Sequence, residues 1–354
     1  MQLAEYLEAV GLSFNPFDGL EASADSRLIS YLIDNEAFEK IWQSKGDYNL
    51  GGESGSGRTA IAERMAYECR TASDGKHIFP VILGESNLLA GDMKRSFYAA
   101  AGLGVLLEAV YHLEKFDRQS PAERLEMINA IETAAPGAIN HLLPQVVQKE
   151  SLKPLSDLID SSSSMLPNQP SANKIRQLAN QIMDLNKSEA GKSVPSIFDI
   201  ITGPFGLSEI KLIADFSHGP SRDDLMELDR VGDVLSGKTN VLKVVMAPSG
   251  ENLQSPMILD WSSKQLEKIL ETRIGVASGG KLGSLDVLSD PSFVNVESKI
   301  VEAAVEHGKT TPRAVISLAN RLLFEGALDS GSIIRQIDGK TFRKAVEKEF
   351  GKLS

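Results

Sequence analysis

The stretch 51-GGESGSGRTA-60 constrains the fold of this 354-residue chain more than any other. From Gly52 it reads G-x-x-x-x-G-R-T, which differs from the phosphate-binding pattern G-x-x-x-x-G-K-[ST] only at Arg58. Successive backbone N–H groups can surround a phosphate when the chain turns tightly, and Gly52, Gly55 and Gly57 permit such turns. The stretch therefore predicts a phosphate-binding loop, with a glycine- and serine-rich turn that matches by chance as the alternative.

The segments around this loop favour the phosphate-binding interpretation. Residues 59-TAIAERMAYECR-70 have high helix propensity, and 77-HIFPVILG-84 is the short apolar run of a buried strand. The stretch before the loop, 47-DYNLG-51, is a weak strand candidate because Asp47 and Asn49 are poor strand formers. The order strand, loop, helix, strand is the one that a phosphate-binding α/β unit requires.

The two residues after the last glycine decide which chemistry the loop supports. Thr59 is the hydroxyl that would hold Mg²⁺, next to a helix N-terminus that attracts anions. Arg58 stands where the pattern has lysine, and its guanidinium is longer and planar. It can contact a phosphate bidentately, but it is less suited to the placement that phosphoryl transfer needs. We expect reduced nucleotide binding and severely reduced hydrolysis.

A second candidate site lies at the end of a later strand. The run 209-EIKLIADF-216 is apolar and closes on Asp215, and 241-VLKVVMAP-248 is a further β-branched strand candidate. An aspartate at the end of a buried strand, following a phosphate-binding loop, holds Mg²⁺ in P-loop NTPases. The alternative is a strand whose last residue begins a turn, where aspartate is common. The order of the motifs favours Asp215 as a metal-binding residue.

The C-terminal part of the chain is predicted to be helical. Helical periodicity extends over residues 262–275, 296–308, 311–327 and 340–353. Pro312 just inside a helix start would place the Arg313 guanidinium at the helix N-terminus. There it can face a γ-phosphate, or it can be an exposed arginine in a first helical turn.

Composition and charge exclude several classes of protein. No stretch approaches ~18 uninterrupted apolar residues, so we expect no membrane span, and the first residues lack the pattern of a secretory signal. The single cysteine, Cys69, excludes an internal disulfide and fits a reducing, cytoplasmic setting. The net charge of −11 disfavours nucleic acid as a partner, so we expect a protein partner or self-association.

Taken in chain order, these pieces resemble the AAA-like/STAND-type bacterial P-loop ATPases, with degenerate Walker A and Walker B motifs. The resemblance covers most of the chain and rests on residues 14–41, 52–65, 195–220, 241–248, 259–274 and 311–323. The stretch 259–274 is similar to the "D-W…L…L…R" helix of that family's lid, and 311–323 is similar to its sensor-2-like "P-R…L…N-R-L-L" helix.

This resemblance implies an α/β fold with a P-loop NTPase three-layer core, a mostly parallel sheet and a C-terminal all-helical lid domain. The implied boundaries are an N-terminal helical segment 1–45, a core 46–255 with a helical insertion at about 86–190, and a lid 256–354. Within the first of these, 25-DSRLISYLIDNEAFEKIWQ-43 predicts one or two amphipathic helices.

The resemblance also implies a site for ATP or ADP with Mg²⁺, at which Thr59 and Asp215 hold the metal. The residues that it places around the nucleotide are Gly52, Gly55, Gly57, Arg58, Thr59, Asp215 and Arg313. The departures from the family fall on the catalytic positions. Besides Arg58, the second acidic residue expected after Asp215 is missing, since Phe216, Ser217 and His218 follow and the next acid is Asp223. No catalytic residue is therefore assigned.

Two functions are consistent with this pattern. The first is a nucleotide-binding switch or regulatory protein with weak or absent hydrolysis, which acts through oligomerisation or partner binding. Such a switch needs only different affinities of its two states for the ligand. The second is a pseudo-ATPase adaptor or scaffold that no longer binds nucleotide. An active ATPase that uses Arg58 with Glu53 or Asp223 is the least favoured.

Overall fold

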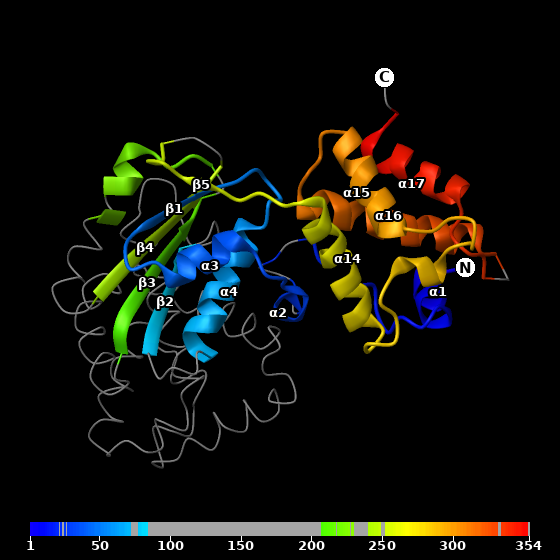
Figure 1. The fold of residues 1–354 in the computed structure, drawn as a ribbon, viewed down its shortest axis with the longest axis horizontal. Helices are drawn as coiled ribbons and strands as arrows, with labels where there is room; N and C mark the ends of the chain where they lie inside the picture. Colours follow the sequence, from blue (N-terminus) through cyan, green and yellow to red (C-terminus); the bar gives the residue numbers. More distant parts are fainter. Residues whose placement is uncertain are drawn as a thin grey trace, which may run out of the picture. The chain divides into compact units, whose positions relative to one another are not determined.

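The structure is a computed structural model. Its chain forms two compact units. The described residues are 1–71 except 21, 23, 24 and 26; 77–83; 207–229 except 217 and 227; 240–248; and 252–352 except 332 and 333. The helical unit comprises Met1–Asn35, Gly52–Ala60 and Leu259–Ser354, and the sheet unit comprises Glu36–Gly51 and Ile61–Ile258 (Figure 1). The helical insertion expected at about 86–190 lies outside the described residues.

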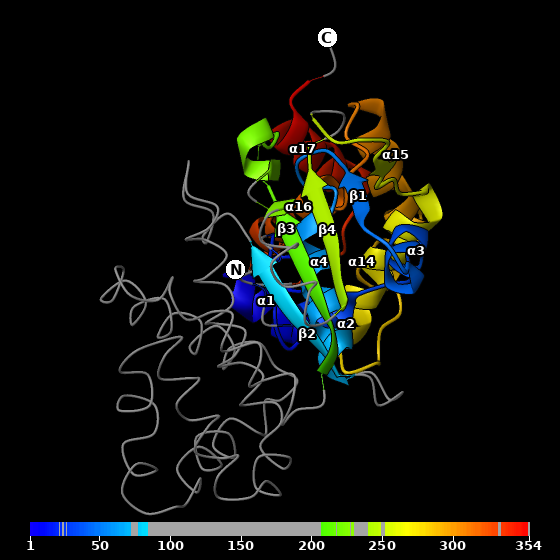
Figure 2. The ribbon, with the colours of Figure 1, turned by 90° about the vertical axis from the view of Figure 1, so that its left-hand side faces the viewer.

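The sheet unit is built on parallel strands. Its described strands are β1 (Tyr48–Gly51), β2 (His77–Leu83), β3 (Leu207–Asp215), β4 (Asn240–Ala247) and the two-residue β5 (Met257–Ile258). They form one sheet in the order β2-β3-β4-β1-β5, and each neighbouring pair is parallel (Figure 2). The predicted α/β fold with a parallel sheet is confirmed, as are the strands predicted from 77–84, 209–216 and 241–248.

The middle of the sheet is buried on both faces. Ile210, Leu212, Ile213 and Ala214 of β3 are all fully inaccessible to solvent, although successive side chains of a strand point to opposite faces. Buried apolar residues on both faces are typical of parallel strands that are covered on both sides, and Lys211 is the one charged residue within this run.

The weak strand candidate before the glycine-rich stretch forms a regular strand, β1. Its four residues pair with β4, from Tyr48 opposite Val244 to Gly51 opposite Ala247, and its end also pairs with β5. Asp47, a poor strand former, accepts a hydrogen bond of 2.9 Å from the backbone N–H of Lys243. Pairing on both sides therefore outweighs the low intrinsic propensity.

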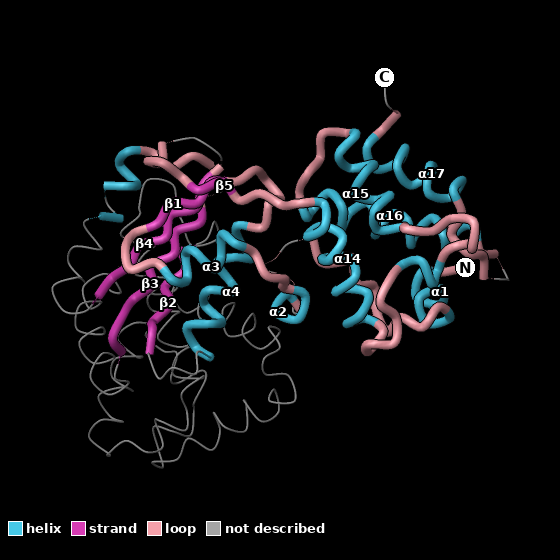
Figure 3. The backbone as a smooth tube through the Cα atoms, in the orientation of Figure 1, coloured by secondary structure: helices cyan, strands magenta, loops and turns pink. Residues whose placement is uncertain are grey.

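Two helices lie beside the sheet (Figure 3). They are α3 (Glu36–Gln43) and α4 (Arg58–Thr71). The rings of Phe38 and Trp42 on α3 are stacked with centroids 6.1 Å apart, and the Arg64 guanidinium of α4 lies 3.9 Å from the Phe38 ring centroid. Trp42 lies 5.2 Å from the ammonium of Lys211, a buried residue of β3. Aromatic and cationic contacts thus join α4, α3 and the sheet.

The helical unit consists mainly of helices. These are α1 (Leu3–Ala9), α2 (Leu28–Tyr31), α14 (Ser263–Ala277), the 3₁₀ helix η2 (Leu285–Leu288), α15 (Val296–Glu306), α16 (Pro312–Asp329) and α17 (Gly339–Phe350). The four helices predicted in the C-terminal part are confirmed. The stretch 25–43 forms two helices, α2 and α3, separated by residues 32–35.

One hydrophobic core spans the helical unit and includes residues from the start of the chain. Tyr6, Leu7, Leu12 and Phe17 are buried together with apolar side chains of α14, α15 and α16. Ser13 adds a backbone hydrogen bond of 2.9 Å to the carbonyl of Ala277. The N-terminal residues therefore belong to the packing of the C-terminal helices.

The starts of α14 and α16 are fixed by side-chain caps. Ser262 and Gln265 form a capping box, in which each side chain bonds the backbone of the other residue. Thr311 caps α16 by accepting from the Ala314 N–H, and Pro312 occupies the first helical position. These caps fix the backbone next to Trp261 and Arg313.

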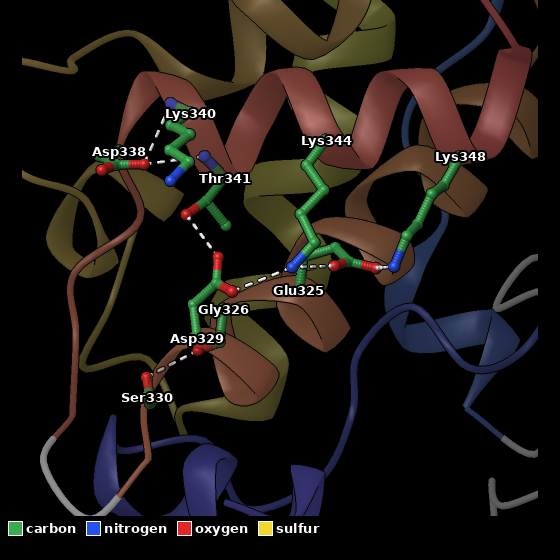
Figure 4. Close-up of polar contacts among 9 residues, drawn as sticks. All are labelled: Glu325, Gly326, Asp329, Ser330, Asp338, Lys340, Thr341, Lys344 and Lys348. Atoms are coloured by element: carbon green, nitrogen blue, oxygen red, sulfur yellow. Dashed lines mark hydrogen bonds and ion pairs between the residues drawn. The ribbon is translucent and has the colours of Figure 1, made fainter.

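Charged side chains join α17 to α16 (Figure 4). Glu325 of α16 is fully buried, and its two carboxylate oxygens lie 2.8 Å from Lys344 Nζ and 2.7 Å from Lys348 Nζ. Lys344 also contacts Asp329 at 2.9 Å, and that carboxylate accepts from the Thr341 hydroxyl at 3.1 Å.

Within the described part of the chain, no helix has both the length and the apolar character needed to cross a membrane.

Candidate functional site

The candidate site is the glycine loop, residues 52–57, between the end of β1 at Gly51 and the start of α4 at Arg58. Gly55 and Gly57 have φ values of +83° and +95°, whereas φ of Ser56 between them is not positive. Positive φ values at alternate residues are one feature of backbone segments whose N–H groups bind anions, although the Ser56 N–H here donates to the Glu53 carbonyl at 3.1 Å. The two glycines occupy a region of φ that other residues reach only with strain.

Close packing also requires glycine in this loop. A Cβ at position 52 would lie 2.5 Å from Ser56 Oγ, and a Cβ at position 55 would lie 2.7 Å from the Cβ of Arg313. A Cβ at position 57 would lie 3.5 Å from Trp261, an ordinary contact, so the positive φ is the stronger constraint there. Close packing at positions 52 and 55 and backbone conformation at position 57 therefore require glycine even without a ligand.

Arg313, predicted as a site residue, lies against the loop. Its backbone N–H donates to the Gly55 carbonyl at 3.3 Å, and its Nη1 donates to Ser54 Oγ at 3.3 Å. Because the cap at Thr311 fixes the first turn of α16, the guanidinium stem is held beside the loop. The structure thus brings Gly52, Gly55, Gly57 and Arg313 together within the helical unit.

A residue that was not assigned to the site, Trp261, makes the shortest of these contacts. Its indole Nε1 donates to the Ser56 carbonyl at 2.7 Å. Trp261 stands just before the N-cap Ser262 of α14. The sequence signal was the "D-W" of 259–274, which supported the family resemblance but did not indicate contact with the loop.

The remaining loop residues lie at the start of α4. Arg58 is the first residue of this 14-residue helix and is buried, and Thr59 follows it with a half-buried side chain. The first N–H groups of a helix have no partner inside the helix, and its dipole makes this end positive. The helix N-terminus therefore places a partial positive charge directly after the glycine loop.

One buried polar atom in the loop, the Ser56 hydroxyl oxygen, could form a hydrogen bond with a ligand. The Ser56 side chain is buried, and its hydroxyl has no hydrogen-bond partner among the described residues. A buried hydroxyl without a partner costs about 1–3 kcal/mol. The features here that suit a phosphate are a glycine loop with positive φ values, a helix N-terminus and a buried hydroxyl without a partner among the described residues.

Asp215 lies at the same edge of the sheet as the end of β1. It is the last residue of β3, is buried, and pairs with Met246 of β4. The next residue of β4, Ala247, pairs with Gly51 of β1. Gly51 and Asp215 therefore end at one carboxyl edge with a single strand between them, about 10 Å apart in the direction across the strands. Asp215 belongs to the sheet unit, whereas the glycine loop belongs to the helical unit.

The residues after Asp215 offer no adjacent carboxylate. Phe216 is buried and its N–H donates to the Met246 carbonyl at 2.8 Å, so the chain stays paired with β4 for one more residue. Position 217 lies outside the described residues, and His218 is exposed. Among the described residues, no three His, Cys, Asp or Glu side chains form a group that could hold a metal ion.

The strand order has a change of direction at β1 and β4. The chain leaves β1 toward β2 on one side of the sheet and leaves β4 toward β5 on the other, although β1 and β4 are neighbours. In open parallel sheets, ligands bind outside the carboxyl ends of two strands whose connections diverge in this way. The glycine loop begins at this position.

Comparison of the chain with protein-family models, with curated proteins and with solved structures gave no significant match in any of the three.

Proposed function

We propose that the chain is an AAA-like/STAND-type nucleotide-binding switch, in which the glycine loop binds the phosphates of ATP or ADP. The observation that carries the proposal is the positive φ of Gly55 and Gly57 in a loop that joins the carboxyl end of β1 to the start of α4. The N-terminus of α4 and the unpartnered Ser56 hydroxyl support the same ligand class.

In this proposal the residues have distinct roles. Backbone N–H groups of the loop hold the phosphates, Arg58 and Arg313 supply positive charge, and Thr59 with Asp215 would hold Mg²⁺ when it accompanies the nucleotide. Mg²⁺ would neutralise phosphate charge there. Hydrolysis is weak or absent, because Arg58 replaces the lysine of the motif and no acid directly follows Asp215.

The switch acts through the C-terminal helices, which we propose to be the lid of the P-loop core. Arg313 and Trp261 come from these helices and hydrogen-bond the loop that receives the phosphates. Occupancy of the loop can therefore alter which arrangement of the helices is stable. With a net charge of −11, the partner is a protein or a second copy of the chain, rather than nucleic acid.

A second function, a pseudo-ATPase adaptor without nucleotide, is favoured by one specific observation. Ser56 and Arg313 explain the absence of side chains at positions 52 and 55, and the positive φ explains position 57. The loop can thus serve as a packing element that joins β1, α4 and the C-terminal helices.

Thermal unfolding with and without ligand separates the two functions. Millimolar ATP or ADP with Mg²⁺ is expected to raise the melting temperature, since a ligand at 100 times its Kd adds about 2.7 kcal/mol. Gly57→Ala should abolish the shift. Gly280→Ala is its matched control, because φ of Gly280 is +80° and a Cβ there meets nothing within 4 Å. Both variants strain the backbone to a similar extent, by about 1–2 kcal/mol, but only one alters the loop.

The absence of a shift in the wild-type chain would exclude the switch and leave the adaptor. If the shift occurs, phosphate release by the wild type and by Arg58→Lys tests the account of hydrolysis. Hydrolysis gained by Arg58→Lys would show that the rest of the site is intact. No gain would assign the defect to the missing acid after Asp215.

A further inference from the structure

Trp261 links the glycine loop to the start of the C-terminal helix α14. The indole N–H donates to the Ser56 carbonyl at 2.7 Å, whereas the Arg313 N–H reaches the Gly55 carbonyl at 3.3 Å. An N–H···O distance of 2.7 Å is at the short end of the normal range for hydrogen bonds. The six-membered ring of Trp261 also lies close to Gly57, since a Cβ there would be 3.5 Å from Cζ2.

The direction of this bond fixes the orientation of a peptide group in the loop. In a trans peptide the carbonyl of one residue and the N–H of the next point in opposite directions. Because the Ser56 carbonyl points at Trp261, the Gly57 N–H points away from the indole. Gly57, with φ of +95°, has little intrinsic preference of its own that would keep this peptide in place.

Trp261 is itself held in place on both sides. Its backbone N–H donates to Asp260 Oδ1 at 2.8 Å, and the next residue, Ser262, is locked in the capping box of α14. Two residues before Trp261, Leu259 is buried, and its Cβ would lie 3.3 Å from a Cβ at position 52. The segment 259–261 therefore runs along the loop from its first glycine to its last.

We propose that Trp261 is a positioning residue for the glycine loop, and this role rests on the proposed binding of phosphates by that loop. The indole holds the 56–57 peptide with its N–H toward the anion. A phosphate that accepts from the Gly57 N–H polarises this peptide and strengthens the bond from its carbonyl to Trp261. Anion binding and the start of α14 are thereby coupled, and the coupling is the same in both directions.

The two tryptophans of the chain provide a matched pair of variants. Trp261→Phe keeps a ring beside Gly57 but removes the donor to Ser56. Trp42→Phe makes the same chemical change in α3 and leaves Trp261 as the only indole. Far-UV circular dichroism of the full-length variants checks that both fold.

The first measurement is amide hydrogen exchange of residues 52–60 without ligand. Trp261→Phe is expected to raise exchange there by roughly 2- to 10-fold, the effect of losing one hydrogen bond. Trp42→Phe should leave it unchanged. Equal exchange in the two variants would overturn the positioning role.

The second measurement is a titration with ATP and Mg²⁺, and with tripolyphosphate as the probe that lacks a nucleoside. Binding to Trp42→Phe is expected to change Trp261 emission and to reduce its quenching by acrylamide. Trp261→Phe should bind roughly 2- to 10-fold more weakly, and an unchanged Kd would overturn the coupling. If the wild-type chain binds neither probe while Trp261→Phe still loosens the loop, the proposed function is lost and the positioning role stands.

Discussion

The hydroxyl of Tyr6 is buried in the core of the helical unit and has no hydrogen-bond partner among the described residues. Burial raises the pKa of Tyr6 to about 12 from an ordinary value of 10.0. Because the fold disfavours the ionised form, the chain keeps its full stability relative to that form below pH 10.0 and loses it as the pH rises toward 12. The side chain faces Gly326 of α16, where a Cβ would lie 2.9 Å from the Tyr6 oxygen.

A double-mutant cycle tests this contact between a hydroxyl and a glycine. Tyr6→Phe is expected to raise the free energy of unfolding by about 1 kcal/mol, because it removes an unpaired polar group. Gly326→Ala should destabilise the wild type by roughly 1–3 kcal/mol through overpacking, despite the helix propensity of alanine. In Tyr6→Phe the same substitution should cost less, so urea unfolding should give a favourable coupling of about 1 kcal/mol.

Gly275→Ala is the control for that cycle. Gly275 also lies in a helix, α14, but a Cβ there meets only the Leu282 carbonyl at 3.8 Å. It should stabilise the chain equally in both backgrounds. A coupling between Tyr6 and Gly326 below about 0.3 kcal/mol would mean that the hydroxyl does not need the space.

The packing of α17 on α16 involves a buried carboxylate, Glu325, and two partly exposed lysines, Lys344 and Lys348. Burial alone would raise the pKa of Glu325, but the hydrogen bonds and charges of Lys344 and Lys348 outweigh it and hold the pKa below its ordinary value. The carboxylate is fully buried, whereas both lysines reach solvent. Removing the lysines therefore leaves a buried charge without compensation, while removing the carboxylate leaves two cations that can turn to water.

Substitutions in this cluster should have unequal effects on stability. Lys344→Met with Lys348→Met is expected to lower the free energy of unfolding by about 3–5 kcal/mol at pH 7. Glu325→Gln should lower it by about 1–3 kcal/mol.

The same carboxylate should make stability depend on pH. Since the folded pKa of Glu325 is depressed, its contribution is present above pH 4.5 and is lost as the pH falls through the folded pKa. Denaturation between pH 3 and 7 should thus show a shallower acid loss in Glu325→Gln. Asp290→Asn, which removes a carboxylate whose pKa is lowered by hydrogen bonds from Ser292, is the comparison. An equal acid loss in wild type and Glu325→Gln would contradict the account.

At the level of elements, the sequence was most informative where the signal is local. Ser262 with Gln265, and Thr311 with Pro312, predicted helix starts that the structure confirms. The spacing of Lys344 and Lys348 places both on one face of α17, but their common partner Glu325 follows only from how α17 packs on α16. The strand β1 was a weak candidate because its stability comes from β4 and β5, which are nearly 200 residues away in the chain.

At the scale of the whole molecule, the order of motifs predicted the α/β class and the parallel sheet, since both follow from the sequence of short apolar strands and helices. The contacts that assemble the candidate site were less accessible. Arg313 was selected through a family resemblance, whereas Trp261 was not selected, because no local pattern shows that an indole some 200 residues away reaches the Ser56 carbonyl. The same reason concealed the place of residues 1–17 in the core of the C-terminal helices.

This last contact gives a prediction for the whole chain. Deleting residues 2–17 removes four core side chains: Tyr6, Leu7, Leu12 and Phe17. At about 1.5–3 kcal/mol for each, the loss is roughly 6–12 kcal/mol, comparable with the entire stability of a typical domain. We expect the C-terminal helices to lose their fixed packing, although the deletion leaves all of them in the chain. Hydrogen exchange of α14, α15 and α16 should then approach that of an unfolded chain.

Two point variants separate packing from the mere loss of chain length. Phe17→Ala removes a fully buried ring and should cost about 3–5 kcal/mol. Leu328→Ala shortens a side chain of α16 that is 62% exposed, and should change the free energy of unfolding by less than about 0.5 kcal/mol. If the deleted chain retains slow exchange in α14–α16, the C-terminal helices pack without the N-terminal residues. In that case residues 1–17 would add little to the stability of the helical unit, and Phe17→Ala should lower the free energy of unfolding only slightly.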